Sequence, residues 1–159
     1  GGSAWDFALT GTGDMLGVDG LSWGAGYGVE EVDANGNTSA DFDDNKHYTG
    51  FINYSMGPMT VGYQESQIDN GGKASRDETT QQWGIAFAVN DDLSVSYGER
   101  EVEYSIPVAD DVTEQGEGIA IAYTMGSMKI AGNTNEVSNN GGTAGTSDEM
   151  TEIALSFAF

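Results

Sequence analysis

Apolar and polar residues alternate along much of this chain, most clearly at its end. In the last eight residues, EIALSFAF, the bulky apolar side chains share one parity, and small or polar side chains take the other. Successive side chains of a β-strand point to opposite faces, so a period of two predicts a strand. The same period recurs upstream and predicts about nine strands and no helix. They centre on residues 5–9, 21–29, 48–54, 59–63, 83–89, 93–97, 119–123, 128–130 and 153–159.

The connections between these segments alternate in length. Short connections are expected at residues 10–20, 55–58, 90–92 and 125–127, and long polar ones at 33–47, 66–79, 105–116 and 135–149. Tight turns at one end and long loops at the other indicate an up-and-down antiparallel sheet. The two ends of such a sheet would face different environments.

Aromatic residues mark one face of the predicted sheet. All of them except Phe42, Phe51 and Tyr104 share the apolar parity, and the opposite parity is mostly Gly, Ala, Ser, Thr, Asn and Gln. Many of these aromatics lie near strand ends, as do the two interfacial girdles of a transmembrane β-barrel. The fold class predicted is therefore all-β, a transmembrane antiparallel up-and-down β-barrel.

Composition narrows the possible functions. The chain has 26 acidic and five basic residues, a formal net charge of -21, and no cysteine. The negative charge argues against nucleic acid as a partner, because phosphate contacts need Lys or Arg. The lack of cysteine excludes disulfides and thiolate metal sites. No catalytic sequence motif is present, so we expect no enzyme activity.

A soluble β-sandwich or lipocalin-like barrel is the main alternative, because its core would show the same period. Most of the acidic residues, however, lie in the four long connections and their flanks, and the polar parity carries few charges for a solvent surface. These two features favour the membrane barrel.

The chain resembles the Gram-negative outer-membrane general porins, and the alphaproteobacterial type in particular. The segments WGIAFAVNDDLSVSYGERE and GEGIAIAYTMGSMKIAG look like porin hairpins, and the terminal strand ends on Phe159. In that family the last strand is an assembly signal, which the resemblance carries to Phe159. The resemblance implies passive diffusion of small hydrophilic solutes and ions across the outer membrane. It also implies a homotrimer with membrane lipid and lipopolysaccharide as neighbours.

Strand direction gives a further expectation. If Phe159 ends a strand at the periplasmic rim, the strand at residues 5–9 also descends, so the chain would start outside. Bacterial barrels have even strand numbers and usually begin in the periplasm. We therefore expect residues 1–159 to be a single barrel segment, the C-terminal half of a porin of about sixteen strands. A complete small barrel is the other possibility.

The polar parity supplies the candidate pore wall. Polar and charged side chains there would contact permeating solutes, and opposed charges would orient them. The candidates are Arg100, Lys129, Glu152, Asp6, Gln64, Gln82, Asn53 and Asn133. Because the long loops are acidic, we expect them to enrich cations near the mouth of the channel and the channel to prefer cations.

One acidic loop raises the question of a metal. Oxygen-bearing side chains occupy positions 1, 3, 5, 9 and 12 of a calcium-loop spacing, at Asp33, Asn35, Asn37, Asp41 and Asp44. Thr38 stands where the motif has glycine, so a solvated acidic loop fits the sequence better than a dedicated metal site, and loose divalent binding, Ca²⁺ included, fits better than one defined site. No cofactor is required by this interpretation. Two alternatives stay open: a small closed outer-membrane barrel for adhesion or surface protection, and a soluble calcium-stabilised β domain.

Overall fold

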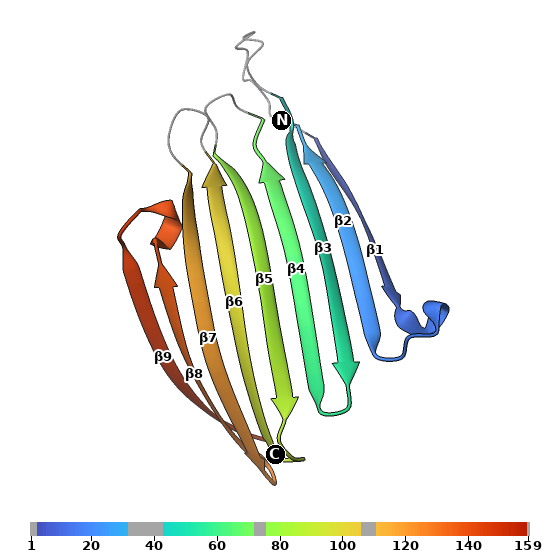
Figure 1. Cartoon of the computed structure of the whole chain (residues 1–159), viewed down its shortest axis with the longest axis vertical. Helices are drawn as coiled ribbons and strands as arrows, with labels where there is room; N and C mark the ends of the chain where they lie inside the picture. Colours follow the sequence, from blue (N-terminus) through green and yellow to red (C-terminus); the bar gives the residue numbers. More distant parts are fainter. Residues whose placement is uncertain (1–2, 32–42, 72–75, 106–110, 159) are drawn as a thin grey trace.

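The computed structural model describes residues 3–31, 43–71, 76–105 and 111–158, which form one antiparallel sheet (Figure 1). Nine strands follow one another in sequence order, as the alternation predicted. They are β1 (Ala4–Thr12), β2 (Leu21–Glu30), β3 (Asn45–Met56), β4 (Met59–Asp69), β5 (Asp77–Ala88), β6 (Leu93–Ser105), β7 (Val112–Met125), β8 (Met128–Ser138) and β9 (Ser147–Phe157). Two short 3-10 turns, η1 (Gly13–Leu16) and η2 (Asn140–Gly142), lie in connections.

Every strand pairs with its neighbours in the sequence. Among the described residues, β1 and β9 form the two edges of the sheet and do not pair with each other. Strand lengths of 9 to 14 residues cover the roughly 9–11 residues that a tilted strand needs to cross a bilayer. None of the described helices is long and apolar enough to span a membrane.

The short turns lie at one end of the sheet and the long connections at the other (Figure 1). Two of the short turns consist of two residues and open on Gly57 and Gly126, with φ of 58° and 59°. A positive φ at the first position of such a turn is that of type II′, which suits the twist of the flanking strands. Glycine adopts this conformation without the Cβ clash that other residues meet.

The strands extend further toward the long connections than the alternation predicted. Residues 66–69, 77–79, 112–116, 135–138 and 147–149 pair in the strand ladder, although we expected all of them in loops. The positions of the apolar parity are polar here, and Ile68, Val112 and Val137 lie on the other parity, so the expected period is lost while the backbone hydrogen bonds continue. Many acidic residues expected in loops therefore lie on strands.

The register keeps each parity on one side of the sheet throughout. Trp5, Tyr27, Ile52, Trp83 and Ile121 lie on one side, which we call the apolar face, and the other side is the polar face. Large hydrophobic side chains of the apolar face are exposed: 52% for Ile121, 82% for Ile153. Among the described residues, Val102 is the one buried hydrophobic side chain, and it lies on the polar face. The apolar face is therefore not the core of a water-soluble fold.

Candidate functional site

The polar face carries all eight side chains predicted for the pore wall. Gln64, Gln82 and Arg100 form one row across β4, β5 and β6, in direct register. The remaining five are spread over the face, from β1 to β9: Asp6, Asn53, Lys129, Asn133 and Glu152. The parity thus placed these residues on one side, and the register shows which of them are neighbours.

A hollow of about 700 Å³ runs along the polar face of β3 to β8. Sixteen of its 24 lining residues belong to the polar face, among them Asn53, Gln64, Gln82, Ser96 and Arg100, and the other eight have the apolar parity. Between these polar groups lie glycine and alanine, whose small size leaves open volume. The hollow can therefore hold water and small polar solutes against hydrogen-bonding groups.

Glycine allows two larger side chains to lie flat on this face. A Cβ at Gly24 would come within 2.4 Å of the Phe51 ring, and one at Gly62 within 2.3 Å of Asn53 Oδ1. Either contact is shorter than real Cβ atoms tolerate, so the larger side chain would have to move outward. Gly24 on β2 and Gly62 on β4 therefore let Phe51 and Asn53 lie close to the backbone of the neighbouring strand.

Two of the predicted wall residues are linked near the sheet's β9 edge. Asn133 Nδ2 donates a long hydrogen bond of 3.5 Å to Glu152 Oε2. Lys129 lies on β8 one residue from the short turn, opposite Ser156. Asp6 lies on β1 opposite Gly28. These charged groups are far apart on the sheet and form no single site.

Arg100 does not stand alone on the polar face. Its guanidinium forms an ion pair with Glu114, whose residue is 4% exposed. Tyr104 Oη also donates to Glu114, at 3.4 Å, and the Arg76 guanidinium lies 3.9 Å from the centre of the Tyr104 ring. Of this group we predicted only Arg100. Tyr104 broke the aromatic parity, and that was the available signal of a special position.

The β8–β9 connection forms hydrogen bonds with this group. We call residues 139–146 the lip. Its Gly141 N–H donates to Glu114 Oε2 at 2.7 Å, and its Gly141 carbonyl accepts from Arg76 Nη1 at 3.1 Å. Asn139 Nδ2 donates to the Thr113 carbonyl at 2.9 Å. The lip thus crosses the end of β8 and lies on the polar face of β6 and β7.

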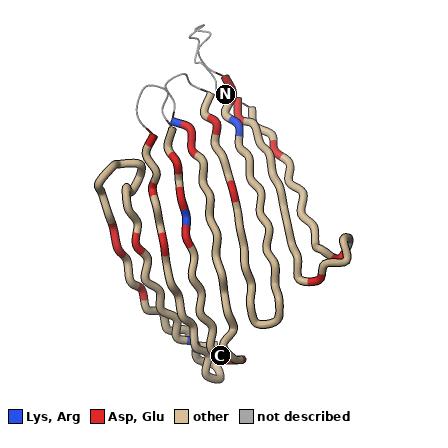
Figure 2. Tube along the Cα trace, viewed as in Figure 1, with Lys and Arg blue, Asp and Glu red and all other residues tan. Residues whose placement is uncertain are grey.

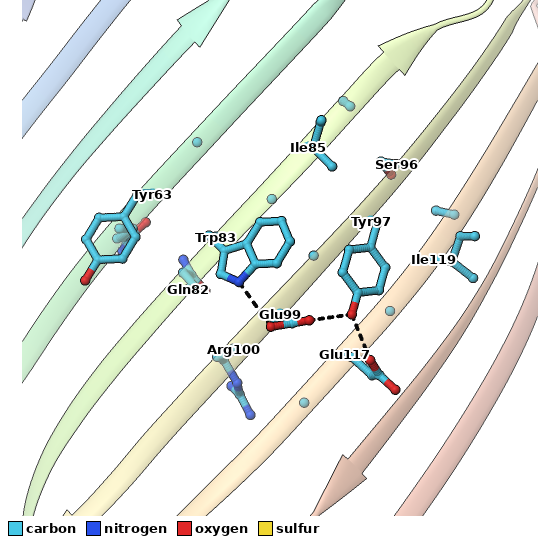
Figure 3. Close-up of a pocket in the computed structure, with 18 of the residues that line it drawn as sticks. Tyr63, Gln82, Trp83, Ile85, Ser96, Tyr97, Glu99, Arg100, Glu117 and Ile119 are labelled. Carbon is cyan, nitrogen blue, oxygen red and sulfur yellow. Dashed lines mark hydrogen bonds between the residues drawn. The ribbon is translucent and has the colours of Figure 1, made fainter.

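On the apolar face, aromatic and acidic side chains meet along one line (Figure 3). Trp83 Nε1 donates to Glu99 at 3.1 Å, and Tyr97 Oη donates to Glu99 and Glu117 at 2.6 and 2.8 Å. Tyr63 Oη donates to Glu65 at 2.8 Å in the same manner. Amphipathic rings with a polar tip are typical of the membrane–water boundary. This line is the girdle expected nearer the long loops.

The two acidic residues of that line, Glu99 and Glu117, belong to a row of four carboxylates that lie side by side on the apolar face. The glutamate row consists of Glu99, Glu117, Glu136 and Glu149, directly opposed in register across β6 to β9. Figure 2 shows acidic residues along this half of the sheet, with few basic ones. Like charges directly opposite on a sheet repel each other. The row marks where the apolar face stops being suited to lipid.

Two predictions lie largely outside the described residues. Of the calcium loop, only Asp44 is described, just before β3; Asp33, Asn35, Asn37 and Asp41 are not, and neither is Phe159. Within the described ranges, no group of three or more His, Asp or Glu side chains could hold a metal ion. The calcium loop and the assembly signal stay predictions.

Comparison with known proteins decides the family. The model of the Gram-negative porin family matches residues 2–159. The chain belongs to the Gram-negative porin family. This porin therefore resides in the outer membrane of a Gram-negative bacterium, as the resemblance implied. A search of curated proteins finds no significant match.

Solved structures support the fold of this porin. It is similar to in-vitro folded OmpT, an outer membrane protein of Vibrio cholerae, with a TM-score of 0.67 and 12% identity over 86% of this chain and 45% of that one. A trimer form of the same protein matches with a TM-score of 0.65 and 13% identity, over 97% of this chain and 54% of that one. The chain thus spans about half the length of these structures, and at such identities the likeness concerns the fold.

Proposed function

We propose that the chain forms part of the wall of a passive diffusion channel for small hydrophilic solutes and ions. The observation that carries the proposal is the contrast between the two faces: exposed hydrophobic side chains on one, and on the other an open hollow of about 700 Å³ lined mostly by small and polar residues of the polar face. In a barrel wall, these faces correspond to lipid and lumen. Family membership favours a channel over an enzyme.

The channel prefers cations in this proposal. On the strands of the polar face, carboxylates outnumber basic groups. The acidic positions are Asp6, Glu30, Glu78, Glu114, Asp148 and Glu152, and the basic ones are Arg100 and Lys129. Because Glu78 and Glu114 form ion pairs with Arg76 and Arg100, the negative excess rests on Asp6, Glu30, Asp148 and Glu152 against Lys129. A lumen lined by one sign of charge concentrates the opposite ion.

Reversal potentials across a planar bilayer in a KCl gradient test both parts of the proposal. The full-length protein should conduct, and its reversal potential should have the sign of cation selectivity. Glu152→Gln should lower that selectivity because it removes a carboxylate from the polar face. Glu117→Gln removes the same charge from the apolar face and should leave selectivity unchanged. Anion preference in the parent protein would refute the cation assignment, and no conductance would refute the channel.

The assembly belongs to the same proposal. The chain spans about half of the solved structures and its described strands form an open sheet, which supports a C-terminal half of a barrel of about sixteen strands. One of those structures is a trimer form, so we propose a homotrimer with lipopolysaccharide around its lipid-facing surface. Light scattering of the detergent-purified protein measures the subunit number directly. A monomer at all concentrations would contradict the trimer.

A further inference from the structure

We propose that the lip narrows the channel at its long-loop end and limits the size of the solutes that enter, with Glu114 as the residue that positions it. The inference rests on the proposed channel function, because only a lumen can be narrowed. Its basis is the fold of residues 139–146 over the polar face, which joins segments 65 residues apart in sequence at the Arg76–Gly141 contact.

Hydrogen bonds at Gly141 N–H, the Gly141 carbonyl and Asn139 Nδ2 attach the lip to Glu114, Arg76 and the Thr113 carbonyl. Glu114 accepts from Arg100, Tyr104 and the Gly141 N–H, and its residue is 4% exposed. A buried carboxylate is stable only when it is paired and hydrogen-bonded, so these donors and Glu114 hold one another in place. Arg76 closes the arrangement from the other side through the Gly141 carbonyl.

Shape complementarity points the same way. A Cβ at Gly142 would lie 2.5 Å from Cδ2 of the Tyr104 ring, and Gly142 has a φ of 73°. The backbone can therefore lie directly on the ring only with glycine at this position. The lip is thus a packed part of the wall.

The charges of the attachment nearly cancel. Arg76 is 3.0 Å from Glu78 Oε1, and Arg100 is paired with Glu114. Because the surroundings of the lip are nearly neutral, we expect the lip to have little effect on the selectivity between cations and anions. Its effect is steric, since a backbone segment that lies over the polar face reduces the open cross-section of the lumen. The discriminating property is therefore solute size.

Cysteine cross-linking tests where the lip lies without any assumption about conduction. The chain has no cysteine of its own. In the full-length protein, Gly142→Cys combined with Tyr104→Cys should form a disulfide on mild oxidation. Gly142→Cys combined with Glu103→Cys and Tyr104→Ala should not, because position 103 lies on the opposite face of the same strand. Tyr104→Ala removes the ring that a Cβ at position 142 would meet, as Tyr104→Cys does in the test pair. Cross-linking to position 103 and not to 104 would overturn the placement.

Permeation measurements test what the lip does. Asn139 N–H donates to the Thr146 carbonyl at 2.7 Å, so a two-residue Asn-Gly turn can replace residues 140–145. This replacement and Glu114→Ala should each raise single-channel conductance, and should raise the trisaccharide-to-monosaccharide permeation ratio in liposome swelling. Glu117→Gln, on the same strand but the apolar face, should change neither. Two independent variants guard against misfolding of either one.

The outcomes separate the two proposals. A parent protein that conducts while the lip replacement leaves size discrimination unchanged would overturn the narrowing and leave the channel intact. A parent protein that does not conduct at all, although positions 104 and 142 cross-link, would overturn both. Higher conductance with a higher permeation ratio in both variants supports the lip as the size-selecting element.

Discussion

Arginine placed on one face or the other of β7 distinguishes lipid from lumen at neighbouring residues. Ile121 lies in the middle of the apolar run on β7, opposite Val95 and Gly132, and is 52% exposed. On a lipid-facing surface, Ile121→Arg would place a charge near the bilayer centre. That costs about 2–4 kcal/mol of folding free energy, which falls toward zero near the interface.

The adjacent position provides the control. Ala120 is on the polar face, opposite Ser96 and Asn133, so an arginine there points into the hollow. Ala120→Arg should change stability by no more than about 0.5 kcal/mol. Since Ala120→Arg can cost up to about 0.5 kcal/mol, the difference between the variants is about 1.5–4 kcal/mol, or roughly 10- to 700-fold in the folding equilibrium at about 1.4 kcal/mol per tenfold.

The assay is reversible denaturant unfolding of the full-length protein refolded into phospholipid vesicles, followed by tryptophan fluorescence and by the heat-dependent shift in gel mobility. Equal effects of Ile121→Arg and Ala120→Arg would refute the assignment of the faces. A larger loss for Ala120→Arg would mean that the faces are reversed. A folding defect confined to Ile121→Arg would support the assignment of the apolar face to lipid and the polar face to the lumen.

Two further substitutions test local features. Gly20→Ala should destabilise the protein more than Gly17→Ala in the same unfolding assay. Both glycines have a positive φ, but only at Gly20 would a Cβ approach a backbone oxygen, that of Ser55, at 2.1 Å. Equal losses of stability would contradict this prediction. Glu136→Gln should raise the unfolding midpoint at low salt, since it removes a carboxylate flanked on both sides in the glutamate row, and the gain should vanish in high salt. A loss of stability at low salt would contradict repulsion within the row.

The sequence predicted the strands well where lipid is the environment. Between the aromatic girdles one parity must be apolar, so segments such as 83–89 and 119–123 show the period plainly. Above the girdle, both faces meet water, and Glu99, Glu101 and Glu103 resemble loop residues although their backbones pair in β6. Strand ends were therefore predicted too short at the long-loop end.

The candidate site, too, was predictable from the sequence only in part. Parity alone placed Gln64, Gln82 and Arg100 on one face, because side-chain direction in a strand is a local property. The partner of Arg100, by contrast, depends on the register of β6 with β7, and the Arg76–Gly141 contact depends on where a distant loop folds. Neither follows from local alternation, and the exceptional parity of Tyr104 only indicated that something differed there.

The strictly sequential strand order has a consequence for how such walls change over time. Since each described strand pairs only with those before and after it in the chain, a hairpin is a self-contained piece of wall. Duplicating or losing one hairpin preserves the direction of every other strand and the side on which its residues lie. The circumference of the barrel, and with it the width of the opening, can therefore evolve in steps of two strands without redesigning the rest.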